Sequence, residues 1–231
     1  MTDRNVDVVF LDAGGVLVVP QREVICERFA AAGFEVDPEL LFEAHYRGVH
    51  AIDVAQAEPE VFDDYHRAYA AHLGLDEEQL VAATEILDNL WQISGLWQQA
   101  LPWAAEGLAT IAATDVPIVI VSNADGTVDQ VLAQAGLLQV GPGDGVEVFA
   151  IVDSGAIGIA KPDPAIFHHA LELVGATADR AIHVGDAYQY DVLGARAAGV
   201  RPVLVDPLGI RTDADCERVA SLIEVADLIG G

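Results

Sequence analysis

The chain has 231 residues, a length that can bury a sizeable core and hold one domain with an inserted segment. Its hydrophobic content of 52% is high, but no uncharged apolar run reaches the roughly 18 residues that would suggest a membrane span. The 37 acidic residues outnumber the 11 basic ones and give a net charge of −26, which argues against nucleic acids and anionic membranes as partners.

The N-terminus and the cysteines indicate an intracellular protein. Residues 1–5 contain no apolar segment of the kind that opens a secretory signal. Cys26 and Cys216 are far apart in the sequence and neither has a metal-ligand neighbour, which is typical of a reducing compartment. We therefore expect a cytoplasmic protein. Both a monomer and a homodimer stay open.

The N-terminal part of the chain opens with one strand and continues as helices. The apolar run Val6–Leu11 predicts a buried strand, and two glycines follow it closely. Amphipathic stretches then predict four helices, with Gly33, Pro59 and Gly74 as breaks. These helices are Glu23–Ala32, Pro38–His50, Glu60–Leu73 and Glu77–Trp91. We expect residues 20–98 to form a separate helical domain.

Strand and helix signals alternate after Pro102. The predicted strands are Pro117–Val121, Val148–Val152, Ala181–Val184 and Pro202–Val205; the predicted helices are Trp103–Ala113, Thr127–Ala135, Pro164–Val174, Val192–Ala198 and a last one from about Ala214. This alternation favours an α/β fold with a Rossmann-like, doubly wound parallel sheet. We expect this core domain to comprise residues 1–19 and 99–231, with the helical domain inserted after the first strand.

Polar residues accompany four of these strands. They lie in the segments Leu11–Leu17, Val121–Asn123, Lys161–Pro164 and Gly185–Asp191. Because the carboxyl ends of parallel strands meet at one edge of a sheet, these segments should come together there. At that edge one carboxylate could attack a substrate, a hydroxyl and an ammonium could hold an oxyanion, and further carboxylates could bind a metal ion.

In this order, the four segments resemble the four motifs of the haloacid dehalogenase-like hydrolase superfamily, most of whose members are Mg²⁺-dependent phosphatases. The resemblance extends over nearly the whole chain and implies a C1-type helical cap at residues 20–98. It also implies a small phosphorylated substrate and an aspartyl-phosphate formed on Asp12. The alternative for Asp12 is a strand-terminal aspartate that only caps a turn.

Three further residues are candidates for binding the phosphoryl group. Lys161 is the only lysine of the chain, and a compact ammonium can pair with both the nucleophile and the transferred group, so we expect it to act in catalysis and in binding. Ser122 and Asn123 offer a hydroxyl and backbone N–H groups to a phosphoryl oxygen. The alternative for Ser122 is an ordinary helix N-cap.

Asp186 and Asp191 are candidate metal ligands. Together with Asp12 they offer an oxygen-only site, which suits Mg²⁺. For Asp191, direct binding, binding through water and orientation of Lys161 are all open, and the residue could also cap the following helix. The resemblance adds the backbone carbonyl of Gly14 as a further metal ligand.

Gly14 departs from the pattern of the family. The phosphatases of the superfamily carry an aspartate at this position, which protonates the leaving oxygen and later activates water. Such acid–base help is typically worth about 10²–10⁴ in rate. Three substitutes are open: a histidine of the cap (His45, His50 or His66), a leaving group that needs no proton, or slow turnover.

Two other functions stay open alongside a phosphatase. A protein that binds phosphate and metal with little or no turnover would need no acid at Gly14. A 2-haloacid dehalogenase would need no metal, and the Gly185-Asp186 pair argues against it. The phosphonoacetaldehyde hydrolase mechanism is excluded, because it requires a cap lysine and residues 20–98 contain none.

Overall fold

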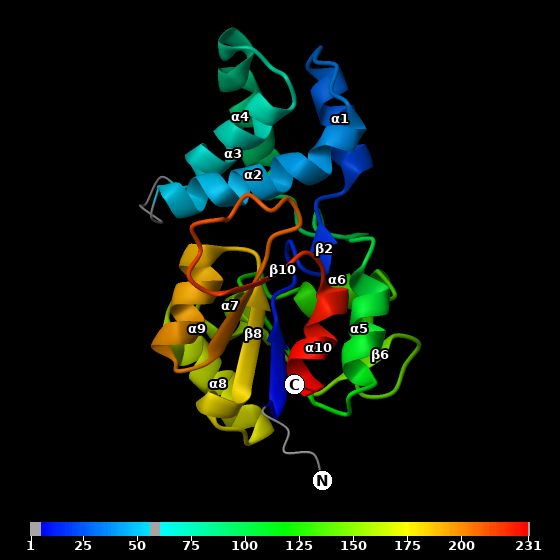
Figure 1. Ribbon diagram of the computed structural model, residues 1–231. Helices are drawn as coiled ribbons and strands as arrows, with labels where there is room; N and C mark the ends of the chain where they lie inside the picture. The colour runs from blue at the N-terminus through cyan, green and yellow to red at the C-terminus, as the bar shows by residue number, and fades with distance from the viewer. Residues whose placement is uncertain (1–5, 56–60, 231) are drawn as a thin grey trace. The chain divides into compact units, whose positions relative to one another are not determined.

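The computed structural model describes residues 6–55 and 61–230 (Figure 1). The chain divides into two compact units. The first comprises Met1–Val18 together with Ala100–Gly231, and the second comprises Val19–Gln99. No helix within the described residues is both long enough and apolar enough to cross a membrane.

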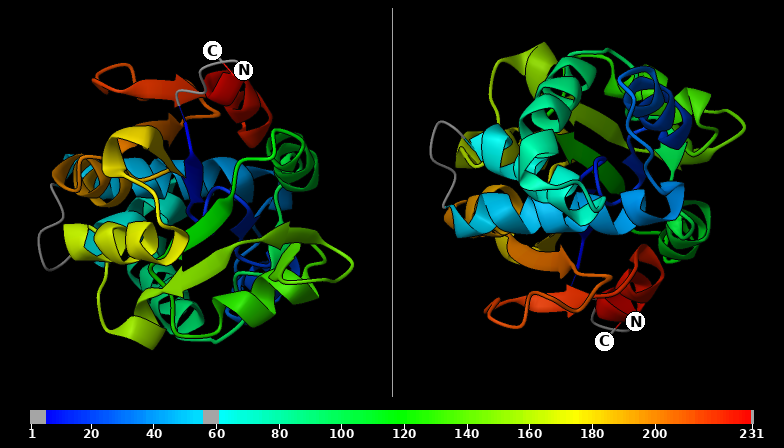
Figure 2. Two further views of the ribbon diagram at one scale, coloured as in Figure 1. Left: turned by 90° about the horizontal axis from the view of Figure 1, so that it is seen from below. Right: turned by 90° about the horizontal axis from the view of Figure 1, so that it is seen from above.

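The first unit is built on a six-stranded sheet in the order β10-β9-β8-β1-β4-β7, with neighbouring strands parallel throughout. The strands are β1 (Val8–Leu11), β4 (Ile118–Ser122), β7 (Ala150–Asp153), β8 (Ala181–Gly185), β9 (Arg201–Val205) and β10 (Glu217–Val219). Helices lie on both faces of this sheet (Figure 2). The predicted α/β fold with a doubly wound parallel sheet is confirmed.

The central strands form because they are apolar on both faces. Every residue of β1, β4 and β8 is buried, as expected for a parallel sheet that helices cover on both sides. On one face, Phe10 and Val121 belong to the same hydrophobic cluster as Ile166 and Phe167 of α8 (Pro164–Val174). Further α-helices of this unit are α5 (Ala104–Ala112), α6 (Val128–Gln134), α7 (Ser154–Ile157), α9 (Leu193–Ala197) and α10 (Val225–Gly230).

The strand order reverses at β1, which lies between β4 and β8. The chain passes from β1 to β4 and β7 on one side, and then to β8, β9 and β10 on the other. In open α/β sheets, such a reversal creates a crevice outside the carboxyl ends of the strands, where ligands bind. The residues at the carboxyl ends of β1, β4 and β8, which are Asp12, Ser122 and Asp186, therefore lie at this crevice.

The helix predicted from about Ala214 is wrong. Glu217 instead begins strand β10 and pairs with Val203 of β9, and an α-helix starts only at Val225. An edge strand has a neighbour on one side only and is short here, so its sequence carries little alternation that could reveal it.

One predicted strand is divided between two observed strands. The prediction Val148–Val152 overlaps β7, but Val148 ends a separate strand, β6 (Val146–Val148), which pairs in parallel with β5 (Leu138–Val140). Phe149 separates β6 from β7 and donates its backbone N–H to the Ile118 carbonyl oxygen. One continuous apolar run thus contributes to two sheets.

The second unit is mainly helical in its described residues. It contains α1 (Arg22–Ala31), a 3₁₀ turn (Pro38–Leu40), α2 (Leu41–Val54), α3 (Val61–His72) and α4 (Glu77–Trp91). Asp76 and Gln79 form a capping box that starts α4. Aromatic side chains join the helices: His45 Nδ1 lies 2.8 Å from the Tyr65 hydroxyl oxygen, and the Tyr65 and Trp91 ring centroids are 5.6 Å apart.

Two short strands lie where the chain passes from one unit to the other. β2 (Val18–Val19) pairs with β3 (Gln99–Ala100). The predicted break at Pro59, the predicted helix start at Glu60 and the N-terminal residues 1–5 lie outside the described residues.

Candidate active site

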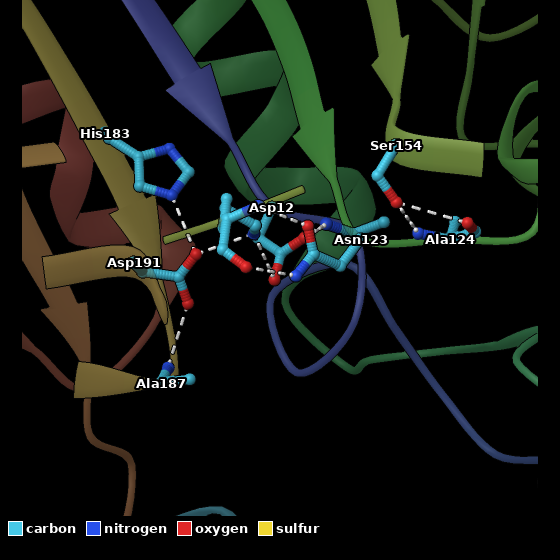
Figure 3. A network of polar contacts seen from close by, with 9 residues as sticks. Asp12, Asn123, Ala124, Ser154, His183, Ala187 and Asp191 are labelled. Atoms are coloured by element: carbon cyan, nitrogen blue, oxygen red, sulfur yellow. Dashed lines mark hydrogen bonds and ion pairs between the residues drawn. The ribbon is translucent and has the colours of Figure 1, made fainter. Parts of the chain in front are cut away.

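Asp12 directly follows β1, and its surroundings fix its carboxylate (Figure 3). Its backbone N–H donates to the Val184 carbonyl oxygen of β8 at 2.9 Å. Oδ1 accepts a hydrogen bond from the backbone N–H of Ala13 at 2.7 Å, and Oδ2 lies 3.0 Å from Lys161 Nζ. The side chain is 13% exposed, and burial raises the pKa of Asp12 although Lys161 opposes the shift. One carboxylate is thus held at the sheet edge with a cation beside it.

Backbone hydrogen bonds within the turn that follows β1 hold its conformation. The Ala13 carbonyl oxygen accepts hydrogen bonds from the N–H groups of Leu17 and Val18 at 2.9 and 3.0 Å. Gly15 has a φ of 65°, in the left-handed region that a residue without Cβ adopts at little cost. Among the described residues, none donates a hydrogen bond to the Gly14 carbonyl oxygen, so this oxygen can serve another partner.

Lys161 lies in a buried position between two carboxylates. Its Nζ is 2.6 Å from Asp191 Oδ1 and 3.0 Å from Asp12 Oδ2, and 1% of its side chain is exposed. Burial alone would lower the pKa of Lys161, but the charges of Asp12 and Asp191 outweigh burial and the pKa is raised. The ammonium therefore stays charged, and two of its three N–H groups serve these ion pairs.

Asn123 fixes the backbone on which Lys161 lies. Its side-chain Oδ1 accepts the Lys161 backbone N–H at 2.8 Å, and its Nδ2 donates to the Lys161 carbonyl oxygen at 2.9 Å. Each end of the Asn123 amide makes one bond to the Lys161 backbone, so the second Nδ2–H and the backbone N–H of this residue are the donors it offers to a phosphoryl oxygen. No local pattern in the sequence predicts this contact between the second and third segments.

Ser122 ends β4 in a buried position, opposite Asp153 of β7 in the sheet register. Within the described part of the chain its hydroxyl makes no hydrogen bond, which leaves it able to donate to a ligand oxygen. The helix that follows begins at Val128, so the alternative that Ser122 is its N-cap is wrong.

Asp153 and Ser154 hold the loop after Ser122, and the sequence analysis missed both. The Asp153 carboxylate accepts backbone N–H groups from Gly126, Val128 and Gly155 at 2.9–3.2 Å. The Ser154 hydroxyl accepts the N–H of Ala124 and donates to the carbonyl oxygen of Ala124 (Figure 3). Their position directly after the strand predicted at Val148–Val152 is the signal that could have found them.

Three carboxylates meet beside this lysine. Asp12, Asp186 and Asp191 each offer an oxygen, and these oxygens all lie within 4.8 Å of one another. Asp186 and Asp191 are buried. A Cβ at Gly185 would overlap the Asp191 carboxyl group, so the glycine is required for Asp191 to lie where it does. The structure thus brings the fourth segment to the first, as predicted.

Asp191 accepts three hydrogen bonds. Its Oδ1 accepts from Lys161 Nζ at 2.6 Å and lies 2.8 Å from His183 Nε2, and its Oδ2 accepts from the Ala187 backbone N–H at 3.0 Å (Figure 3). Burial alone would raise the pKa of Asp191, but Lys161 and His183 hold it well below its ordinary value. Asp191 lies inside the π-helical turn Tyr188–Val192, so the alternative that it caps the next helix is wrong.

Comparison with known proteins agrees with this geometry. The chain matches a family model for haloacid dehalogenase-like hydrolases over residues 6–199. It is 33% identical over 133 residues to haloacid dehalogenase-like hydrolase domain-containing protein 3 of Bos taurus, covering 57% of this chain and 50% of that protein. It is 48% identical over 67 residues to a phosphoserine phosphatase of Thermus thermophilus, covering 29% of this chain and 27% of that protein. The chain thus spans at most half the length of these curated relatives.

Solved structures share the fold at low identity. A phosphatase from Thermococcus onnurineus superposes with a TM-score of 0.59 at 19% identity, over 97% of this chain and 98% of that one. An L-2-haloacid dehalogenase from Xanthobacter autotrophicus gives the same TM-score at 18% identity, over 98% and 99%. The fold therefore does not distinguish the two chemistries. The family model and the fold together establish that this chain belongs to the haloacid dehalogenase-like hydrolase family.

Proposed function

We propose that this chain is a Mg²⁺-dependent phosphomonoesterase that cleaves a small phosphorylated metabolite through an aspartyl-phosphate on Asp12. The observation that carries the proposal is the cluster around Asp12: Lys161 Nζ at 3.0 Å, and oxygens of Asp186 and Asp191 within 4.8 Å. The phosphoserine phosphatase among the relatives supports it.

The donor set fits Mg²⁺. All the side-chain ligands on offer are carboxylate oxygens, the hard donors that this ion prefers. The resemblance to the family adds the Gly14 carbonyl oxygen as a further ligand. The three carboxylates exceed the single ammonium of Lys161 by two charges, which a divalent cation would neutralise. When bound, the ion would draw charge from the phosphoryl oxygens and lessen their repulsion from Asp12. Asp12 and Asp186 would be the primary ligands. Asp191 Oδ1 already serves Lys161 and His183, so Asp191 would contribute through Oδ2, which also accepts the Ala187 N–H.

The residues of the chain divide the chemistry between them. In the first step a carboxylate oxygen of Asp12 forms a bond to phosphorus, and the bond from phosphorus to the ester oxygen breaks. Lys161 and the Ser122 hydroxyl compensate the charge on the phosphoryl oxygens. In the second step a water oxygen bonds to phosphorus and the bond from phosphorus to the Asp12 oxygen breaks, which releases inorganic phosphate and restores the carboxylate. With no acid or base at Gly14, the leaving ester oxygen takes its proton from solvent and the attacking water gives one up to solvent.

A phosphate-release screen with a trapping step tests this function. The protein is incubated with phosphomonoesters, phosphoserine among them, in Mg²⁺ and in EDTA, and inorganic phosphate is measured. Acid-quenched samples are then digested, and mass spectrometry shows whether the Asp12 peptide carries a phosphoryl group. We expect phosphate release only with Mg²⁺. Binding of inorganic phosphate without any turnover would favour the alternative that Gly14 suggests, a phosphate-binding protein of little or no activity.

Removing one proposed metal ligand should weaken metal binding strongly. Asp186→Ala should weaken Mg²⁺ binding by about 100-fold or more, because even partners outside the ligand shell are worth about 10–100-fold. Isothermal titration calorimetry with Mg²⁺ measures this, and Asp129→Ala, on the exposed face of α6, is the matched control. Unchanged Mg²⁺ affinity in Asp186→Ala, or metal-independent release of halide from a 2-haloacid, would contradict the proposal.

Gly14 should make the rate depend on the leaving group. With no acid to protonate the ester oxygen, aryl phosphates should be cleaved about 10²-fold or more faster than alkyl phosphates. Gly14→Asp should raise the alkyl phosphatase rate, because it supplies the missing acid. The φ of Gly14 is not positive, so a residue with a Cβ can adopt this backbone conformation. Gly14→Asn, of equal shape but without a proton to give, should not raise that rate.

Rapid cleavage of alkyl phosphates by the wild type would suggest that a histidine of the second unit is the acid. His45 and His66 are buried there and His50 is partly buried. If the wild type cleaves alkyl phosphates rapidly, and replacing one of these histidines changes its pH profile, that histidine supplies the acid. The deficiency attributed to Gly14 would then not exist.

A further inference from the structure

His183 is a polar residue in the middle of an otherwise apolar strand. It lies in β8, is 0% exposed, and its ring packs edge-on against Phe167 with the centroids 4.8 Å apart. Its Nε2 lies 2.8 Å from Asp191 Oδ1, the same oxygen that accepts Lys161 Nζ (Figure 3). No step of the proposed reaction uses this histidine.

The contacts of the His183 ring show which of its two nitrogens carries the hydrogen. Asp191 Oδ1 faces the Lys161 ammonium at 2.6 Å, so it is a charged acceptor, and His183 Nε2 must donate to it. The other nitrogen, Nδ1, is buried and has no hydrogen-bond partner among the described residues. A hydrogen there would be an unpaired buried donor, so the ring carries its hydrogen on Nε2.

The fold alone does not explain a histidine at this position. The unpaired Nδ1 costs stability, because water could hydrogen-bond it in the unfolded chain and nothing does so in the described structure. Ile182 and Val184, its neighbours on β8, are buried without any such cost. Within residues 6–55 and 61–230, the one polar contact of the His183 ring is with Asp191, so the reason for the histidine lies at that carboxylate.

We propose that His183 is a positioning residue for Lys161, acting through Asp191. By donating to Oδ1, it fixes the carboxylate oxygen that Lys161 contacts, while the Ala187 N–H fixes Oδ2. The ammonium is then held between Asp191 and Asp12, with its remaining N–H left for a phosphoryl oxygen. The catalytic consequence rests on the proposed phosphatase function, whereas the placement of Lys161 does not.

The sole lysine of the chain provides a direct test of that placement. Labelling with ¹⁵N- and ¹³C-lysine gives a single side-chain NMR signal, that of Lys161, which needs no assignment. His183→Leu and His183→Phe replace the ring donor with an apolar side chain that suits the buried position, and each should shift or broaden this signal. His183→Gln, whose side-chain amide can donate from the position of Nε2, should restore it. His168→Leu, on the exposed side of α8, is the matched control and should leave the signal unchanged.

Kinetics and thermal unfolding separate positioning from a structural role. We expect His183→Leu to lower kcat by about tenfold or more with a smaller change in KM, and His183→Gln to recover most of the loss. The melting temperature of His183→Leu should stay the same or rise, because the unpaired nitrogen is gone. If His183→Leu does not fold, the same measurements on His183→Phe take its place.

Two results would overturn this role. A lysine signal that is unchanged in folded His183→Leu or His183→Phe would show that Asp191 needs no help to hold Lys161. A lower melting temperature with normal kcat would show that His183 only supports the fold. If the wild type cleaves no phosphate ester, the proposed function fails, but the lysine signal still decides whether His183 places Lys161.

Discussion

Replacing Asp12 with asparagine should reduce phosphatase activity by about 10³-fold or more, equivalent to roughly 4 kcal/mol of transition-state stabilisation. An amide oxygen is a poor nucleophile and cannot form the aspartyl-phosphate. Asparagine has nearly the same shape, and its side-chain oxygen can still accept the Ala13 N–H that Asp12 Oδ1 accepts. The shape of the site should therefore be kept, but the amide Nδ2 then faces the Lys161 ammonium where Oδ2 did, so a thermal melt must accompany the measurement of phosphate release from an aryl phosphate in Mg²⁺.

The control variant is Asp129→Asn, which makes the same chemical change on the exposed face of α6 and should leave activity unchanged. Mass spectrometry of the Asp12→Asn preparation is needed as well, because a trace of deamidated protein would imitate residual activity. The phosphoryl group trapped on the Asp12 peptide of the wild type should be missing from the variant. Residual activity within about tenfold of the wild type, in protein free of aspartate at position 12, would falsify the covalent mechanism.

The sequence was sufficient to predict the parts of the fold that have strong local patterns. The apolar runs at β1, β4 and β8 are unbroken because both faces of a parallel sheet are covered, and helix α4 was predicted with its observed bounds, Glu77–Trp91. Strand β10 was not predicted, because a three-residue edge strand is defined by its pairing with β9 and not by a pattern of its own. Local pattern thus identified the centre of the sheet and failed at its edge.

The candidate site divides in a similar way. Asp12 and Asp186 could be found because each follows a predicted strand within two residues, and Lys161 because it is the only lysine of the chain. The supporting contacts depend on which strands are neighbours, which no local pattern reveals. Asn123 can bond to the Lys161 backbone because the fold brings the two distant segments together. Asp153 holds the loop after β4 because β4 and β7 are adjacent in the sheet. His183 did carry a signal, as the one polar side chain in the apolar strand Ala181–Val184, but its partner Asp191 follows from the turn after β8.

Replacing Lys161 with alanine should lower phosphatase activity by about 10²-fold or more, a loss of roughly 2.7 kcal/mol that corresponds to one preorganised charge contact. The lysine supplies a positive charge next to Asp12 inside a protein whose net charge of −26 repels anions. Without it, the phosphoryl group would meet the Asp12 carboxylate with less compensation. Phosphate release in saturating Mg²⁺, measured well below the melting temperature, tests this expectation.

Stability and activity must be separated for this residue, because Lys161 is also the cation of a buried ion-pair cluster. Lys161→Ala leaves Asp12 and Asp191 without their shared partner, and breaking a buried pair typically costs about 3–5 kcal/mol. Lys161→Arg separates the two effects, because it keeps a charge in the cluster and should retain more stability than Lys161→Ala. It should still recover little activity, since a planar guanidinium cannot occupy the position of a compact ammonium that is 1% exposed. If Lys161→Ala is less stable but hydrolyses phosphate esters normally, the lysine is structural, and the charge that compensates the phosphoryl group must come from elsewhere.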